Sequence, residues 1–444
     1  MIEEIEELIK KKNYKKLKEE LAKINNFDLA ELIEDLKRDE AIKVFSIMEK
    51  DKAAEVFTNL PIETEAELIS VLTDKEAVAL LNEMYADDAA DLVEEMPANV
   101  VKRLLKKCPK ETRNDINRLL NYPENSAGSL MTVEFAELKE NLSIEKALEK
   151  LRKEKEEYET LNTCFVVNAS RKLLGHISLE NIVFAKPEKT IKEIYNDNII
   201  SVKTTEDQEE VANMFKKYDL TVMPVVDSEE RLVGIITIDD VVDVLEEEAT
   251  EDMEIMAAIT PSSKSYLKTG IFEIWKNRIP WLLLMMLSAT FTGKIIEHYE
   301  GALAGYIILT SFIPMLMGTG GNAGSQSSVT VIRGISLGEI EFSDILKVMW
   351  KEFGVAIICG LTLAIINFLR LILIDKLEVL VSVVVCITLF VTVLVSKLIG
   401  CILPLVAKKI GFDPAVMASP FITTIVDAVS LLTYFQIASM LLGI

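Results

Sequence analysis

Residues 420–435 read PFITTIVDAVSLLTYF and place one carboxylate, Asp427, deep in an otherwise apolar segment. Thr423 precedes it by about one turn, and a helix would present Pro420, Thr424 and Asp427 on one face because they are spaced i, i+4, i+7. An ionisable residue inside a membrane span is expensive to bury and usually marks an ion pathway. A structural hydrogen bond is the alternative. Oxygen ligands without sulphur or imidazole favour a hard cation such as Mg²⁺.

Five long apolar stretches contain or precede this segment, each near the roughly 20 residues that a spanning helix requires. We therefore predict a five-helix, all-α transmembrane domain over residues 276–444. If the N-terminus is inside, the basic residues of the connectors lie mainly on the cytoplasmic side, in agreement with the positive-inside rule. An odd number of spans then puts the C-terminus outside. The stretches are Ile279–Ile296, Ala302–Gly324, Val355–Ile374, Val379–Val406 and Ala415–Gly443.

Two other spans contain residues that lipid does not favour. The second span ends in GTGGNAGSQ at 318–326, whose glycines allow two helix backbones to approach closely. A close-packing seam explains this run as well as an ion path does. Lys397 in the fourth span either neutralises a carboxylate or extends toward the membrane surface, and the sequence leaves both interpretations open. Because one carboxylate per chain gives a weak cation site, we expect a homodimer in the lipid bilayer that supplies two copies of Asp427.

The charge of the chain is concentrated outside the membrane segment. The 444 residues carry a net charge of −22, nearly all of it before residue 276. Such a surplus repels itself unless cations neutralise it, and it argues against nucleic acid as a partner. The 5 cysteines are scattered and there are only 2 histidines, which disfavours zinc and indicates reduced thiols. The charged N-terminus MIEEIEELIKKK lacks the apolar core of a signal peptide, so we expect the acidic part to stay in the cytoplasm.

The acidic part contains two patterns. From about residue 26 to 120, short amphipathic segments such as AADLVEEMP predict an array of stacked helices. Asp87 and Asp91 lie one turn apart there, and like charges at this spacing destabilise a helix unless a cation lies between them. Two stretches, CFVVNASRKLLGHISLENIV and LTVMPVVDSEERLVGIITIDDVVDVLEEE, then each predict strand, tight turn, strand and helix. The second leads into residues 246–252, where 5 carboxylates fall within about two helical turns. Solvated acids are the alternative for both acidic groups.

Residues 126–248 resemble a pair of CBS domains, and the chain from about residue 26 resembles the MgtE family of magnesium channels. The resemblance is carried by GGNAGSQ at 320–326, DPAVMASPFITTIVDA at 413–428 and TVMPVVDSEERLVGIITIDDVVDVLEEEATEDM at 221–253. It implies a multidomain membrane protein. Its parts would be an all-α superhelical N-domain (1–125), an α/β CBS pair (126–195 and 196–248), a connecting or plug helix (246–275) and the five-helix membrane domain (276–444).

In function, the resemblance implies a homodimeric channel for Mg²⁺ uptake that closes when Mg²⁺ binds between its cytoplasmic domains. Asp427 would be the pore ligand, with Asn322 near the ion path and Glu246–Lys268 as the gating helix. The other pore residues would be Gly321, Ser419, Pro420, Thr423 and Thr424. The regulatory Mg²⁺ ligands would be Glu55, Asp87, Asp91, Asp207, Glu209, Asp219, Asp240, Asp243, Glu247, Glu248, Glu251 and Asp252. ATP is a further candidate ligand of the CBS pair, although no residue set there defines its site.

Two other functions use the same residues. One is a secondary transporter of Mg²⁺ or other divalent cations that is coupled to a second ion. The other is a membrane-anchored CBS sensor that conducts nothing, which is disfavoured because an anchor has no use for an intramembrane aspartate. An enzyme is the weakest hypothesis, since the sequence has no P-loop, nucleophile elbow or HExxH motif. We therefore expect a multi-pass protein of the inner membrane with no obligate protein partner, and selectivity among Mg²⁺, Mn²⁺, Co²⁺ and Ni²⁺ stays open.

Overall fold

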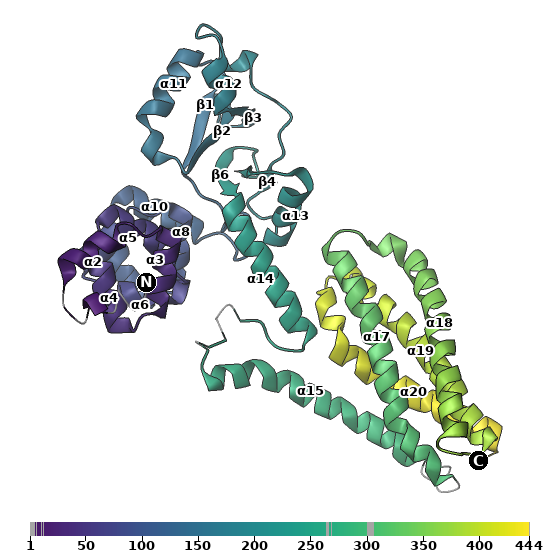
Figure 1. Ribbon diagram of the computed structural model, residues 1–444. Coiled ribbons are helices and arrows are strands. Elements are labelled where there is room, and N and C mark those ends of the chain that lie inside the picture. The colour runs from purple at the N-terminus through teal and green to yellow at the C-terminus, as the bar shows by residue number, and fades with distance from the viewer. Residues whose placement is uncertain are drawn as a thin grey trace. The chain divides into compact units, whose positions relative to one another are not determined.

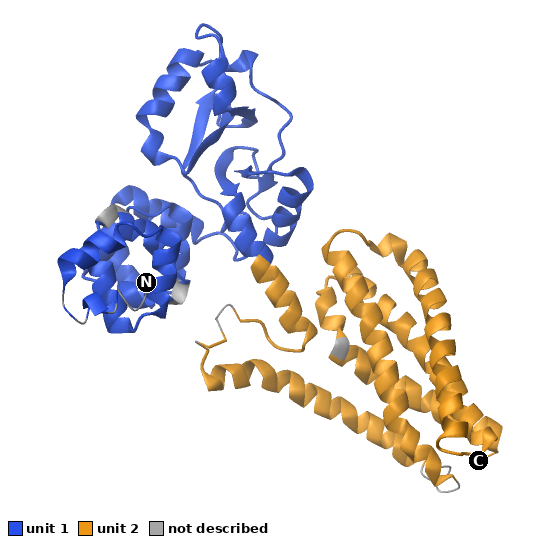
Figure 2. Cartoon of the chain, viewed as in Figure 1, with its two compact units in different colours: residues 1–245 blue, residues 246–444 orange. Residues whose placement is uncertain are grey.

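The computed structural model describes residue 5 and residues 7–9, 11, 13–262, 266–267, 269–299 and 306–443, without the side chains of residues 50, 51, 62, 63 and 419. The chain forms two compact units, residues 1–245 and 246–444, which Figure 2 colours separately. The division falls inside one continuous helix, α14 (Ile238–Met256).

Unit 1 begins with an array of short helices, drawn in purple and blue in Figure 1. They are α2 (Tyr14–Leu21), α3 (Asn26–Asp35), α4 (Arg38–Ile47), α5 (Lys50–Phe57), α6 (Ile62–Val71), α7 (Asp74–Leu81), α8 (Ala86–Glu94), α9 (Ala98–Leu105) and α10 (Lys110–Leu119). Local capping fixes where several of them begin. Asn25 accepts a hydrogen bond from the Phe27 amide at α3, and Thr73 and Glu76 form a capping box at α7. The apolar faces of these helices share one buried core.

Two three-stranded sheets follow and repeat one topology. The first copy contains β1 (Phe135–Lys139), α11 (Ile144–Lys153), η1 (Lys155–Glu157), β2 (Thr160–Val167), β3 (Leu173–Ser178), α12 (Leu179–Phe184) and η2 (Ile191–Glu193). The second contains β4 (Val202–Lys203), α13 (Gln208–Tyr218), β5 (Val222–Val226), β6 (Leu232–Thr237) and the start of α14. In each sheet the first strand pairs parallel with the second, which pairs antiparallel with the third. The predicted tandem α/β repeat is thereby confirmed.

The helix that leaves the second copy is longer at its start and shorter at its end than the predicted gating helix. α14 runs without a break from Ile238, so the acidic residues 246–252 extend the last helix of the repeat. The helix ends at Met256, whereas the sequence predicts a helix to Lys268. The chain turns there because Ala258 adopts a left-handed conformation, with φ of 55°, and Pro261 follows.

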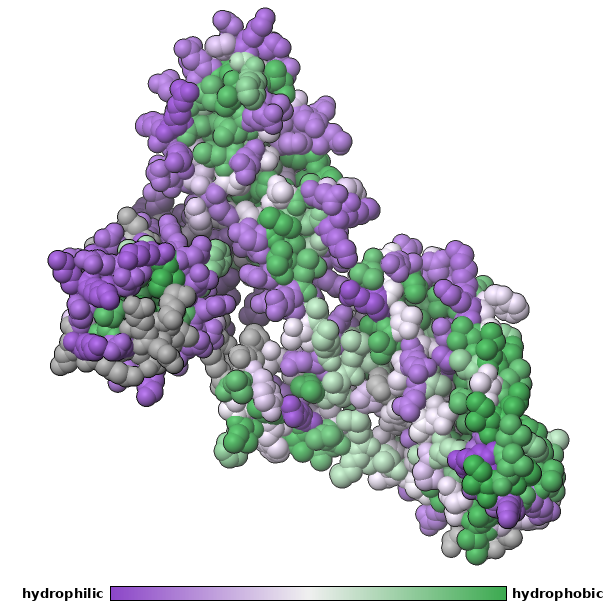
Figure 3. All heavy atoms as spheres, in the orientation of Figure 1, coloured by the Kyte–Doolittle hydropathy of each residue, from purple (hydrophilic) through white to green (hydrophobic). Residues whose placement is uncertain are grey.

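Unit 2 continues with long apolar helices. They are α15 (Ile271–His298), α17 (Ile313–Ser336), α18 (Ile345–Leu373), α19 (Val379–Lys409) and α20 (Ser419–Leu442), with the short turns η3 (Ile307–Phe312), η4 (Phe342–Asp344) and η5 (Pro414–Met417). Within the described residues, 4 helical segments, those of α15, α18, α19 and α20, are long and apolar enough to cross a membrane. The predicted count of five spans is not confirmed, because glycines and polar residues lower the hydropathy of α17. Figure 3 shows apolar residues over much of α18, as lipid contact requires.

The glycine run lies elsewhere in its helix than predicted. The sequence places GGNAGSQ at the end of the second span, but α17 carries it in the middle and continues to Ser336. Glycine inside a helix costs about 1 kcal/mol relative to alanine, so tertiary contacts must offset that cost. Gly320, Gly321 and Gly324 are buried against α19 and α20, and this close packing replaces the missing side chains.

Candidate functional site

Asp427 lies two turns into α20, with its side chain partly exposed. The hydroxyls of Thr423 and Thr424 both donate to the carbonyl oxygen of Pro420, at 2.9 and 3.1 Å. Pro420 stands in the first turn of α20, where its missing N–H costs no helical hydrogen bond. Pro420, Thr424 and Asp427 all lie in α20, so their i, i+4, i+7 spacing puts them on one helix face, as predicted. The side chain of Ser419 lies outside the described residues.

α17 contacts α20 through its glycines. A Cβ atom added to Gly321 would lie 2.8 Å from Cγ2 of Thr423, and one added to Gly324 would lie 2.7 Å from Cγ2 of Ile422. These separations are too short for real side chains, so only glycine allows this approach. The glycine run thus brings the backbone of α17 against the segment of α20 that carries Asp427.

Another face of α17 exposes polar groups. Asn322, Gln326 and Thr330 follow one another at i, i+4, i+8 and are exposed in the single chain. Because α17 packs against α19 and α20, which are long and apolar enough to cross a membrane, we expect this stripe to lie at membrane depth. Unpaired amide groups are costly against hydrocarbon. The stripe therefore requires water or a second protein surface, and Asn322 belongs to it.

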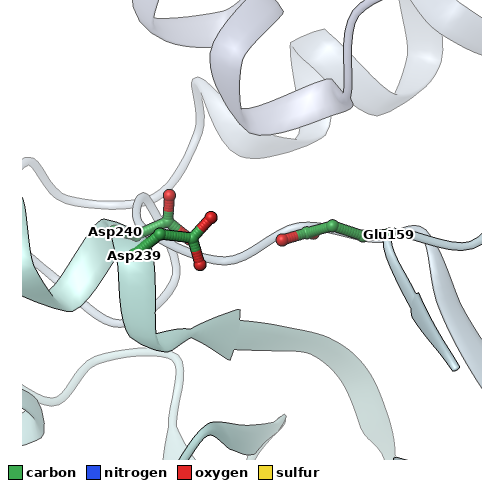
Figure 4. Close-up of side chains that lie close together, drawn as sticks. All are labelled: Glu159, Asp239 and Asp240. Atoms are coloured by element: carbon green, nitrogen blue, oxygen red, sulfur yellow. The ribbon is translucent and has the colours of Figure 1, made fainter. Parts of the chain in front are cut away.

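Unit 1 contains a second candidate site, made of carboxyl groups. Carboxylate oxygens of Glu159, Asp239 and Asp240 all lie within 4.8 Å of one another. Figure 4 shows the Glu159 side chain, which comes from the segment before β2, directed toward the two aspartates in the first turn of α14. Oε2 of Glu159 is buried and has no hydrogen-bond partner among the described residues. Orphaned carboxylate oxygens near two further carboxylates are the donor set that a hard divalent cation requires.

The cluster extends into the helical array. Asp87 on α8 is buried, and the nearby charges of Asp88, Asp240 and Glu159 act on it. Burial is the main cause that raises its pKa far above the usual range, and those neighbouring carboxylates raise it further. Glu65 on α6 is also buried, next to Asp88 and Asp91.

Burial is the largest cause that raises the pKa of the other cluster members, and repulsion by neighbouring carboxylates raises it further. The pKa of Glu65 rises to about 9, that of Glu159 to about 8, that of Asp88 to about 7 and that of Asp240 to about 6. Hydrogen bonds from Thr237 partly counteract the rise for Asp240. Among the described residues, no lysine or arginine forms an ion pair with these four groups. Such a cluster is held together by protons or by cations.

The end of α14 lies against the membrane helices of unit 2. Ile255 and Met256 pack against Ile332 of α17 and against Ala415 and Ala418 near the start of α20. One turn earlier, the carboxylate of Asp252 accepts a hydrogen bond of 3.3 Å from Ser336. Burial first, and then the charge of Asp413, raise the pKa of Asp252, while Ser336 and Arg333 lower it. The acidic helix thus contacts the C-terminal end of the glycine-containing helix.

The predicted regulatory ligands do not form one group. Asp87 and Asp240 meet in the cluster, with Asp91 on the same helix as Asp87. Asp243, Glu247, Glu248 and Glu251 continue along α14 toward Asp252. Three others have local roles that the structure does show.

Glu55 accepts a hydrogen bond from Asn26, and Asp207 caps α13 by accepting from the Glu209 amide. Asp219 ends α13 in a left-handed conformation, with φ of 51°. Glu209 itself stands in the first turn of α13. Cation binding by these four residues stays a prediction.

Glu134, whose charge acts on Asp88, also belongs to the cluster. Five acidic residues of the cluster are not among the predicted ligands. They are Glu65, Asp88, Glu134, Glu159 and Asp239. Asp88 and Asp239 adjoin predicted ligands in the DD pairs 87–88 and 239–240, which was a usable signal. Glu65, Glu134 and Glu159 carry no such signal, because only the tertiary fold brings them to the cluster.

Comparison with known proteins shows the family to which the chain belongs. Family models match residues 313–437 (MgtE, divalent cation transporter), 24–125 (MgtE intracellular N domain), and 127–188 and 191–247 (CBS domain). Magnesium transporter MgtE of Thermus thermophilus is 37% identical over 345 residues, which cover 77% of this chain and 75% of that protein. The chain belongs to the MgtE family. Magnesium transporter MgtE of Bacillus subtilis is 35% identical over 332 residues, which cover 73% of this chain and 71% of that protein.

Membership of the MgtE family confirms the predicted fold class of helical N-domain, CBS pair and helical membrane region. A crystal structure of the cytosolic domain of the Mg²⁺ channel MgtE in complex with ATP is 36% identical, with a TM-score of 0.53. It covers 55% of this chain, and all of that structure is matched. Since MgtE proteins are a transport family of membrane proteins, this chain is a membrane transport protein and not an enzyme, as predicted.

Proposed function

We propose that this MgtE protein is a Mg²⁺-selective channel for Mg²⁺ uptake, gated closed by Mg²⁺ that binds its acidic cytoplasmic cluster. The observation that carries the proposal is the joint face of α17 and α20. There, the glycine run of α17 lies against Thr423, one turn before the aspartate of α20, and a polar stripe is exposed on another face of α17. The choice of ion is supported by two relatives that are named magnesium transporters and are 37% and 35% identical to this chain.

The proposed conducting state is a homodimer. One Asp427 provides a weak site, whereas two related by a two-fold axis give a pair of carboxylates around a largely hydrated Mg²⁺ ion. The same axis would cover the stripe, whose Asn322 and Gln326 amide groups lipid cannot satisfy, whereas the Thr330 hydroxyl donates to the carbonyl oxygen of Gln326. We place the chain in the inner membrane as a multi-pass protein, with its N-terminus in the cytoplasm and its C-terminus outside.

The proposed gate uses α14, which runs through both units without a break. Its first turn carries Asp239 and Asp240 of the cluster, and its last turns carry Asp252 and Met256 against α17. Without a cation, the ionised carboxylates repel one another and the cluster opens. With Mg²⁺ bound, the repulsion is neutralised and α14 is held in one position against the membrane helices.

ATP is a second ligand that we propose for the CBS pair. The related cytosolic domain binds ATP in its crystal structure. In this chain a pocket of about 400 Å³ opens beside β4 and α13, with Ser201, Asn213, Lys217 and Tyr218 among its lining residues. A lysine and an aromatic ring are suitable partners for phosphate and for a base. Calorimetric titration with ATP tests this, and no heat of binding with or without Mg²⁺ would contradict it.

The function is tested by Mg²⁺ influx into proteoliposomes that contain a Mg²⁺-sensitive dye. We expect rapid influx with the wild type and its loss with Asp427→Ala. Asp375→Asn is the matched control. Asp375 lies in the loop after α18, where it forms an ion pair with Arg370 of that helix, and it is not part of the proposed path. Equal influx with Asp427→Ala would remove this residue from the path.

Gating is tested in the same vesicles by raising Mg²⁺ on the cytoplasmic face. The wild type should stop conducting, whereas Asp87→Asn with Asp240→Asn should keep conducting. Influx that requires a Na⁺ or H⁺ gradient would favour the coupled transporter. No wild-type influx at low or high Mg²⁺ would favour the non-conducting sensor.

A further inference from the structure

Lys397 is buried inside the membrane unit. Its side chain, on α19, is 6% exposed, and its Nζ lies 3.6 Å from Oε2 of Glu352 on α18. Nζ also donates a hydrogen bond of 3.2 Å to Oγ of Ser327 on α17. Ser327 in turn donates to Oε2 of Glu352 at 2.6 Å. Of the two interpretations that the sequence left open, the structure supports neutralisation of a carboxylate.

The three side chains join three helices at one point. A buried ion pair is a weak source of stability, because removing two charges from water offsets their attraction. Such pairs are better explained when they select one arrangement of helices over others. Lys397, Ser327 and Glu352 can do this because each comes from a different helix and each meets both of the others.

The glycine run explains why α17 needs such a selection. A Cβ atom added to Gly400 of α19 would lie 2.2 Å from the carbonyl oxygen of Gly324, so the two helices cross in backbone contact. A glycine surface has no side chains to interlock with a neighbour, and it fixes rotation poorly. Ser327 and Lys397 each lie three residues, or about one turn, from this crossing.

Rotation of α17 matters to the ion path. Gly321 contacts Thr423, one turn before Asp427, while the neighbouring Asn322 is exposed on the polar stripe. A shift by one residue turns a helix by about 100°. Such a turn would put another side chain in the position of Asn322 and would take Gly321 away from α20.

We propose that Lys397 is a positioning residue for the ion path: with Glu352 and Ser327 it fixes the rotation of α17 and so holds Gly321 against Thr423 and Asn322 on the polar stripe. This inference rests on the proposed path through α17 and α20. Lys397 does not touch the ion.

Two variants test the network. Lys397→Met combined with Glu352→Met removes both charges and leaves neither unpaired. Ser327→Ala removes only the bridging hydroxyl and keeps the ion pair. The control is Lys347→Met combined with Asp344→Asn, which removes an ion pair of 2.7 Å at the surface of the same unit, where the Lys347 side chain is 84% exposed.

The measurement is the initial influx rate into proteoliposomes at increasing Mg²⁺, and again at increasing Ca²⁺. In both core variants we expect the half-saturating Mg²⁺ concentration to rise and the preference for Mg²⁺ over Ca²⁺ to fall, each by about tenfold, as for a misplaced binding group. The control should match the wild type.

A purely structural role would lower the amount of folded protein and the maximal rate without moving half-saturation or preference. Folded core variants with wild-type values of both would therefore overturn the proposal. If the double variant does not fold, the same result with Ser327→Ala overturns it. Absence of influx in the wild type would instead remove the proposed function, and this inference with it.

Discussion

A buried carboxylate oxygen without a hydrogen bond, as in Glu159, typically costs a protein about 1–3 kcal/mol or more when charged. Asp239 and Asp240 add repulsion, because their carboxylate oxygens lie within 4.8 Å of that of Glu159. A bound divalent cation converts this repulsion into attraction, so one residue contributes to both the instability of the metal-free state and the affinity for the cation.

Glu159→Gln should therefore stabilise the metal-free protein and weaken its response to Mg²⁺. We expect thermal unfolding of the full chain in detergent with EDTA to shift upward by about 2–4 °C, which corresponds to about 1 kcal/mol in a domain of this size. The rise in melting temperature on adding Mg²⁺ should become smaller. Glu156→Gln, at a side chain that is 90% exposed, should change neither value. An unchanged Mg²⁺ response in Glu159→Gln would exclude this carboxylate as a ligand.

The raised pKa values of Glu65 and Glu159 make the metal-free protein sensitive to pH. Their ordinary value is 4.5, and in the folded state they titrate near 9 and 8. Between those limits these two groups bind more protons in the folded state than in the unfolded state, so their contribution to stability is fully present below about pH 4.5 and is lost as pH rises toward about 9.

We expect the melting temperature in EDTA to fall steadily from about pH 5 to about pH 9, and saturating Mg²⁺ to reduce that slope. Glu65→Gln should also reduce the slope in EDTA, because the pKa of Glu65, about 9, is higher than those of Glu159, Asp88 and Asp240. A melting temperature that rises with pH in EDTA would show that these carboxyls are not buried together.

At the scale of elements, the crossing of α17 and α19 leaves no room for a side chain. The carbonyl oxygen of Gly324 occupies the space where a side chain of Gly400 would lie. Gly354 on α18 is the opposite case, since a Cβ atom there would meet nothing within 4 Å. The two positions separate the effect of helix propensity from that of packing.

Gly400→Ala should destabilise the membrane unit by about 1–3 kcal/mol, the usual cost of adding atoms to a packed interior. Gly354→Ala should be neutral or stabilising by up to about 1 kcal/mol, because alanine favours a helix. Thermal unfolding in detergent measures both. Equal effects of the two changes would contradict backbone contact at the crossing.

Across the whole molecule, the net charge of −22 acts at longer range than any single ligand. Salt shortens this range from about 10 Å at 0.1 M to about 3 Å at 1 M. Attraction of Mg²⁺ to the cytoplasmic cluster should weaken accordingly.

The cytoplasmic Mg²⁺ concentration that halves influx should therefore rise when KCl is increased from about 0.1 M to about 1 M. The influx at very low cytoplasmic Mg²⁺ serves as the control for direct effects of salt on conduction. A half-inhibiting concentration that is independent of KCl would mean that direct coordination alone governs gating.

Much of the fold and part of the site could be predicted from local pattern. Apolar runs predict membrane helices, alternating strand residues predict the CBS repeat, and Asp427 stands out because its neighbours are apolar. Each of these signals lies within a few turns of chain. The second predicted span, which becomes α17, is not confirmed, since glycine and polar residues lower the hydropathy on which such a prediction depends.

The partners of buried charges were decided by tertiary structure alone. Glu159 meets Asp239 and Asp240, and Lys397 meets Glu352, across segments that have no sequence pattern in common. The groups that surround a buried charge in space decide whether it is neutralised, and local sequence does not contain that information. The sequence thus determined the family and most of the membrane helices, and it singled out Asp427 as the residue on which the proposed path depends. Only the packing of distant segments decided which carboxylates form the cluster and what neutralises Lys397.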